Sequence, residues 1–94
     1  MAKLIRYWFE FDVKLTDQGI PPGITWGCGL AAYTYDDALF ILNECVFKGI
    51  PVLPIKKVIE DVDLSTLDKA HVLPNIVIPA NHRGVWYPQG YSFL

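Results

Sequence analysis

An apolar stretch that runs directly into an amphipathic helix, from Ile24 to Gly49, constrains the fold of this chain more than any other segment. Its first part, Ile24 to Tyr33, is made of apolar and small residues and predicts a strand. The helix is expected from Tyr35 to Lys48, because Thr34 can accept backbone N–H groups as N-cap and two acidic residues follow in the first turn. Gly49 is expected to end it. A strand joined to a helix in this way predicts a helix packed on a sheet.

A first strand is predicted from Ile5 to Val13, where apolar and charged residues alternate at every second position. Such alternation is typical of an antiparallel strand with one face on the core and one in water. Trp8 is the exception, because it lies on the charged face between Arg6 and Glu10. A segment rich in glycine and proline, Thr16 to Gly23, is expected to connect this strand to the next one as a long hairpin loop.

The side chains of the second strand alternate between two predicted faces. One face carries mostly large apolar groups: Ile24, Trp26, Cys28, Leu30 and Ala32. The other face is made largely of small residues and includes Gly27 and Gly29. Glycine within a strand often marks a place where a ligand or another backbone comes close. These two glycines therefore define one candidate pocket.

The predicted helix has two phenylalanines on its polar side. Steps of about 100° per residue place one broad buried stripe on the helix. Its members are Ala38, Leu39, Ile41, Leu42, Cys45 and Val46. Phe40 and Phe47 fall outside this stripe, seven residues apart, with Glu44 between them. They predict either an exposed aromatic patch, with Trp8 as a third candidate member, or burial under the aromatic tail from Val85 to Leu94.

The second half of the chain predicts shorter elements. Ile55 to Val62 is expected to be a third strand, parallel to the second. Ser65 to Asp68 resembles a capping box and predicts a short helical turn to about His71. Ile76 to Ile78 and Gly84 to Tyr87 each predict a short edge strand.

Together these elements predict a single α+β domain over residues 1–94. We expect a mostly antiparallel sheet of about three to five strands with one main helix packed on one face.

Composition narrows the classes of function. A chain of 94 residues has a small core, and 52 % of these residues are apolar. Some large apolar groups are therefore expected at the surface, where a partner or a second copy could cover them. The net charge of −2 gives no electrostatic reason to expect nucleic acid as a partner. Charged residues near the N-terminus argue against a signal peptide, and no apolar run is long enough to span a membrane. We expect a cytoplasmic protein with reduced cysteines.

Motifs for catalysis or ligand binding are incomplete. Gly27 to Ala32 matches the dinucleotide pattern G-x-G-x-x-A, but it lies too far before the helix for a phosphate to meet the helix N-terminus. Cys28 could act as a nucleophile with His71 or His82 as base, yet nothing in the sequence brings a histidine to that strand. The acidic run at Asp61 lacks the glycine and the glutamate of a calcium loop. We therefore predict no catalytic residue, cofactor or metal.

An acidic cluster near the end of the third strand contains Glu60, Asp61, Asp63 and Asp68. Such a cluster is usually a solvated surface, and the alternative is a docking surface for a basic protein. Combined with the aromatic candidates, it gives the predicted partner-binding set: Trp8, Phe40, Glu44, Phe47, Glu60, Asp61 and Asp63.

Four segments resemble those of a group of short uncharacterised bacterial proteins: Tyr33 to Leu39, Val58 to Asp63, Val72 to Asn75 and Arg83 to Tyr91. The resemblance covers most of the chain. It implies a bacterial, cytoplasmic protein but carries no activity. Small acidic cytoplasmic proteins of bacteria are often immunity proteins that bind secreted toxins, which is an analogy of size and charge.

Three hypotheses of function follow. The first is a non-catalytic protein-binding domain, an immunity or antitoxin-like inhibitor of a basic toxin. The second is a small enzyme or ligand-binding protein with a pocket near Gly27 and Gly29. The third is a homo-oligomer whose aromatic face forms the subunit interface.

Overall fold

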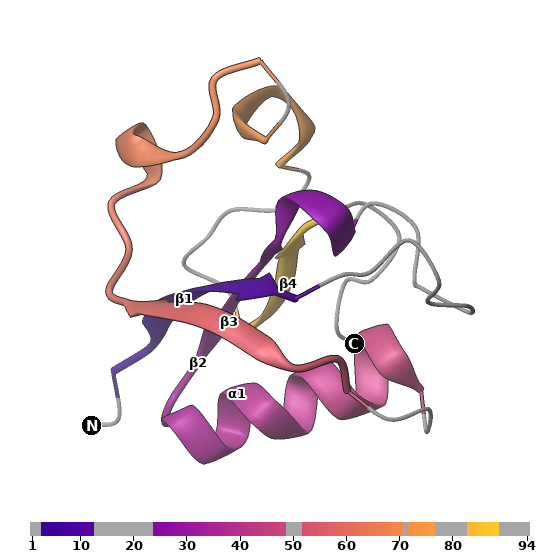
Figure 1. The fold of residues 1–94 in the computed structure, drawn as a ribbon. Coiled ribbons are helices and arrows are strands. Elements are labelled where there is room, and N and C mark those ends of the chain that lie inside the picture. The colour runs from indigo at the N-terminus through magenta and orange to yellow at the C-terminus, as the bar shows by residue number, and fades with distance from the viewer. Residues whose placement is uncertain (1–2, 13–23, 49–51, 71, 77–82, 89–94) are drawn as a thin grey trace.

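The computed structural model describes residues 3–12, 24–48, 52–70, 72–76 and 83–88 (Figure 1). Within them lie four strands and one main helix: β1 (Ile5–Phe11), β2 (Cys28–Ala32), α1 (Tyr35–Ile41), β3 (Ile55–Glu60) and β4 (Gly84–Tyr87). The strands form one antiparallel sheet in the order β3-β1-β2-β4, and α1 lies across one face. The predicted α+β fold is confirmed. No helix of the described part is long and apolar enough to cross a membrane.

The inner strand β1 organises the sheet, because it pairs antiparallel with both β2 and β3. Its alternation is as predicted: Tyr7, Phe9 and Phe11 are buried in the core cluster on the α1 side. β2 and β3 therefore run in the same direction, as expected, with β1 between them. The predicted ends at Val13 and Gly49, and the strand residues Val77 and Ile78, lie outside the described residues.

The second strand is shorter than predicted. Ile24–Trp26 form a 3₁₀ turn, and Gly27 joins this turn to β2 with a φ of +127°. Positive φ is a conformation that glycine adopts at low cost. Because the turn breaks the two-residue alternation, Trp26 does not share the buried face of Cys28 as expected and is 47 % exposed.

The main helix begins as predicted and ends at Lys48. The Thr34 hydroxyl accepts a hydrogen bond from the backbone N–H of Asp37 at 3.0 Å, as an N-cap does. After Ile41 the helix continues as a π-helix, η2 (Leu42–Phe47). Lys48 follows with a left-handed φ of +50°, the conformation that commonly ends a helix.

The sheet face opposite α1 is also covered. A second cluster of buried side chains packs there: Trp8, Ala31, Val62, Leu67, Val72, Trp86 and Tyr87. The segment from residue 61 to 76 crosses this side of the sheet, away from α1 (Figure 1). It contains two 3₁₀ turns, η3 (Leu64–Thr66) and η4 (Leu73–Asn75). The helical turn predicted from Ser65 to about His71 is instead the shorter η3, which has Asp63 as its N-cap and ends at Thr66.

Gly27 and Gly29 lie beneath two indole rings. A Cβ atom on Gly27 would lie 2.4 Å from the Trp8 ring, and one on Gly29 would lie 2.3 Å from the Trp86 ring. The two rings stack with their centroids 6.2 Å apart. The close approach expected at these glycines is therefore made by the protein's own tryptophans.

Replacing Gly29 by alanine tests this contact. Gly29→Ala should lower the free energy of unfolding by about 1–3 kcal/mol, because the new methyl overlaps the Trp86 ring. Urea unfolding measures the change. At a strand position with room for a methyl group, the same substitution is expected to raise the free energy of unfolding, since alanine loses less backbone entropy than glycine on folding.

The double variant Gly29→Ala/Trp86→Leu is the control for this experiment. Removing the ring should relieve the clash, so the loss in the double variant should be smaller than the sum of the two single losses. An additive result would mean that the Trp86 ring does not lie on Gly29.

Candidate functional site

The outer face of the main helix carries exposed aromatic and acidic side chains. Phe40 is 50 % exposed. Asp36 precedes it by four residues and Glu44 follows it by four, so these three side chains lie about one turn apart on one side of the helix. Tyr33 and Tyr35 are exposed at the helix start. We call these five residues, Tyr33, Tyr35, Asp36, Phe40 and Glu44, the helix surface.

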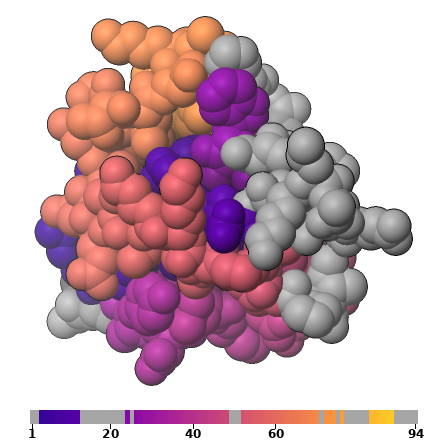
Figure 2. Space-filling view, viewed as in Figure 1, coloured from indigo at the N-terminus to yellow at the C-terminus, as the bar shows by residue number. Residues whose placement is uncertain are grey.

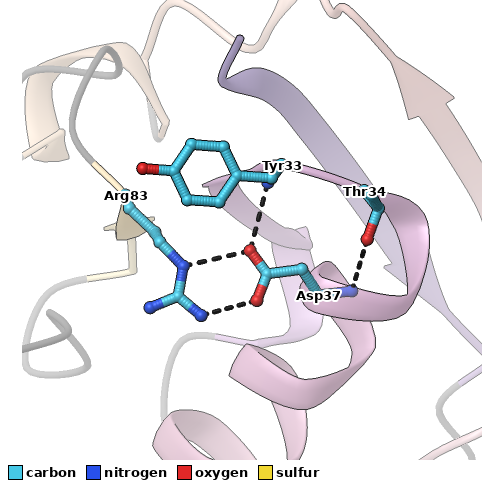
Figure 3. Close-up of polar contacts among 4 residues, drawn as sticks. All are labelled: Tyr33, Thr34, Asp37 and Arg83. Carbon is cyan, nitrogen blue, oxygen red and sulfur yellow. Dashed lines mark hydrogen bonds and ion pairs between the residues drawn. The ribbon is translucent and has the colours of Figure 1, made fainter. Parts of the chain in front are cut away.

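A hydrogen-bond network holds the start of this helix in place (Figure 3). The Asp37 carboxylate accepts from the backbone N–H of Tyr33 at 3.1 Å and from Nε of Arg83 at 3.0 Å. A second bond from the Arg83 guanidinium makes the pair bidentate. The hydrogen bonds from Arg83 lower the pKa of Asp37 below its usual value. The pair joins the helix start to the residue before β4, a contact that sequence reasoning missed because 46 residues separate the partners.

Phe47 is buried, so of the two alternatives predicted for it the exposed one is wrong. Its side chain is 1 % exposed, and its ring meets the Phe11 ring edge-on with centroids 5.5 Å apart. The cause is the π-helix from Leu42 to Phe47. In a π-helix, backbone hydrogen bonds join residues five positions apart, so each turn is wider than in an α-helix. Phe47 therefore lies below Leu42 on the buried side, where steps of about 100° would not place it.

Trp8 is buried as well, which corrects its predicted place in an exposed patch. It is 3 % exposed and lies against Trp86 and Tyr87. Its indole N–H donates to the Glu10 carboxylate at 3.1 Å, so the polar atom of the ring has a partner. The charged face of β1 predicted a solvated side of the sheet, but the segment from residue 61 to 76 packs over it.

Three acidic members of the predicted set are exposed where β3 ends. We call Glu60, Asp61 and Asp63 the acidic turn. Asp63 also has a structural role, because it accepts from the backbone N–H of Ser65 at 3.0 Å and from its hydroxyl at 2.8 Å. These bonds lower the pKa of Asp63.

The acidic turn and the helix start meet at one side chain, Tyr7. Glu60 is opposite Tyr7 in the β1–β3 pair, and the Tyr35 ring has its centroid 6.3 Å from that of Tyr7. Burial raises the pKa of the Tyr7 phenol, and the carboxylates of Glu60 and Asp37 raise it further. Glu60 comes from β3 and Asp37 from α1. Acidic groups of both elements therefore lie at one end of the sheet. Of the three aromatic residues in the predicted set, Phe40 is the one that is exposed.

The residues considered for catalysis do not form a reactive site among the described residues. Cys28 is fully buried, and burial raises the pKa of its thiol far above the usual value, which disfavours the nucleophilic thiolate. His71 and His82 lie outside the described residues. Within the described ranges, no cluster of His, Cys, Asp and Glu could hold a metal ion. Gly27 and Gly29 do not form the turn between strand and helix that a dinucleotide site requires.

No protein-family model, curated protein or solved structure matches the chain. Its function therefore has to be argued from its surfaces.

The two phenylalanines of the helix give a matched pair of variants. Phe47→Ala should lower the free energy of unfolding by about 3–5 kcal/mol, because it leaves a cavity in the core. Phe40→Ala should change it by no more than about 0.5 kcal/mol. Chemical denaturation of both variants checks the difference. Similar losses in the two variants would contradict the burial of Phe47 and the exposure of Phe40.

The Asp37–Arg83 pair predicts a dependence of stability on pH. Because the folded pKa of Asp37 is lowered, its contribution is present above the unfolded value of about 3.9 and is lost as the pH falls through the folded value. Asp37→Asn should therefore cost about 1 kcal/mol at neutral pH. The difference from the wild type should shrink below about pH 4.

Unfolding free energies measured from pH 7 down to pH 2 test this dependence. Asp36→Asn is the control, since no described residue bonds its side chain. A difference between wild type and Asp37→Asn that stays constant over this range would exclude the proposed linkage.

Proposed function

We propose that this protein is a non-catalytic protein-binding domain, an immunity or antitoxin-like inhibitor that binds a basic toxin through the helix surface. The observation that carries the proposal is the half-exposed ring of Phe40, about one helical turn from Asp36 and from Glu44. A large ring surrounded by polar groups is a common form of interface hot spot. The proposed location is the bacterial cytoplasm.

Electrostatics favour a basic partner. The chain has a net charge of −2, and the acidic turn and the helix start bring carboxylates to the same end of the sheet. Charges at the rim of an interface act mainly on the rate and specificity of association. Glu60, Asp61 and Asp36 would thus guide a cationic protein toward the ring of Phe40.

The alternative of an enzyme or ligand-binding pocket near the strand glycines has less support. The faces of Gly27 and Gly29 are filled by the rings of Trp8 and Trp86, which leaves no space for a ligand against that backbone. The nearby thiol of Cys28 is fully buried, and burial raises its pKa, which disfavours the reactive thiolate.

The proposal is tested with a partner captured from a lysate of the protein's own organism and then purified. We expect a basic protein whose dissociation constant rises with salt concentration. Phe40→Ala should weaken binding about 30-fold, which corresponds to the roughly 2 kcal/mol of a hot-spot residue. Calorimetry or biolayer interferometry measures the constants.

Trp26→Ala is the matched control, because Trp26 has a similar exposure but lies outside the helix surface. This variant should bind like the wild type. A partner that binds Phe40→Ala as tightly as the wild type, or a capture that yields no basic protein, would overturn the proposal.

A further inference from the structure

Among the residues that the structure describes, none pairs with the outer edge of β3. β3 is the first strand of the sheet order and pairs with β1 on one side. Among the described residues, no backbone hydrogen bond reaches its other side. Figure 2 shows the residues of β3 at the surface, between α1 and the segment that follows the strand. An open edge presents unpaired N–H and C=O groups to which another strand can bond.

The charges along β3 are divided between its two ends. Lys56 and Lys57 lie near the start of the strand, and Glu60 lies at its end. In an antiparallel pair the start of one strand meets the end of the other. A second copy of β3 therefore brings opposite charges together, which stabilises a strand pair, whereas a parallel copy would bring like charges together. Lysines on an edge usually discourage pairing, but an antiparallel copy brings Glu60 toward one of the two, Lys56.

We propose that the protein forms a symmetric dimer by antiparallel pairing of β3 with β3 of a second copy, centred on Val58. In a symmetric pair, each side chain stays on its own face of the sheet only if even-numbered residues pair with even-numbered ones and odd with odd. With Val58 opposite its copy, the regular part of β3 from Lys57 to Ile59 pairs with itself. Lys56, at the β-bulge that interrupts the β1–β3 ladder, is then brought toward Glu60 of the other chain. Val58 is 37 % exposed and would be covered by its counterpart.

The neighbouring registers are less favourable. A pair centred on Lys57 sets two ammonium groups against each other. A pair centred on Ile59 needs Asp61 as the partner of Lys57. Asp61 has a φ of +54° and lies beyond the end of β3, so it cannot continue the ladder.

The fold leaves room for this dimer. α1 packs against the inner strand β2 and leaves the β3 edge uncovered. A two-fold axis perpendicular to the sheet joins the two sheets into one of eight strands, four from each copy. Both α1 helices then lie on the same side. The pairing does not use Phe40, so the dimer goes beyond the proposed function and is separate from it.

Charge exchange between positions 56 and 60 tests the pairing. Light scattering after gel filtration should give the wild type twice the 10.6 kDa mass of one chain. Lys56→Glu or Glu60→Lys alone brings like charges together at two symmetric sites, and each should weaken dimerisation at least about tenfold. The double variant Lys56→Glu/Glu60→Lys restores opposite charges and should dimerise like the wild type. Lys69→Glu, at an exposed position outside β3, is the control.

Disulfide cross-linking tests the register. Directly opposite residues of an antiparallel pair have Cα atoms about 4.5–5.5 Å apart, which a disulfide can span. Val58→Cys in a Cys45→Ala background should therefore form a covalent dimer under mild oxidation, and Glu44→Cys in the same background should not.

Three results would overturn the dimer: a monomer mass at all concentrations up to about 100 μM, a dimer that both single charge variants leave intact, or no cross-link at position 58. None of these results depends on the basic partner. A dimer that Phe40→Asp dissociates while Lys56→Glu does not would instead place the interface on the helix surface.

Discussion

Two indole rings packed on two strand glycines are the contact on which the rest of this structure depends. Trp8 and Trp86 can lie against the sheet because Gly27 and Gly29 have no side chains. Each indole buries about 150–250 Å², which stabilises by about 4–6 kcal/mol at about 25 cal/mol per Å². This exceeds the cost of about 1–3 kcal/mol for burying the Trp86 N–H, which has no hydrogen-bond partner among the described residues. The second face of the sheet is thereby closed.

The sequence predicted those parts of the fold that depend on local patterns. Alternation in β1 and the N-cap at Thr34 were correct, because both follow from neighbouring residues. Phe47 was misplaced because the local sequence pattern does not predict that the helix becomes a π-helix after Ile41. Trp8 was misplaced because its cover comes from residues more than fifty positions away.

The candidate site could be predicted only in part, for the same reason. Phe40, Glu44 and the acidic turn were identified, since helical spacing and charge are visible in the sequence. The tyrosines of the helix surface and the Asp37–Arg83 pair were missed, because their positions depend on how the helix start meets β4. With both faces of the sheet covered, the helix surface and the edge of β3 are the two surfaces of the described part that we propose for binding. The helix surface would bind through an aromatic ring and carboxylates, and the β3 edge through backbone hydrogen bonds, so the two can act independently.

Acrylamide quenching of tryptophan fluorescence tests the closed second face most directly. Trp26 is the exposed one of the three tryptophans, and Trp8 and Trp86 are buried. In a Trp26→Phe variant the remaining emission should be nearly insensitive to acrylamide, and urea should restore quenching. Strong quenching of the folded variant would show that the indoles are not packed on the glycines and would contradict the account.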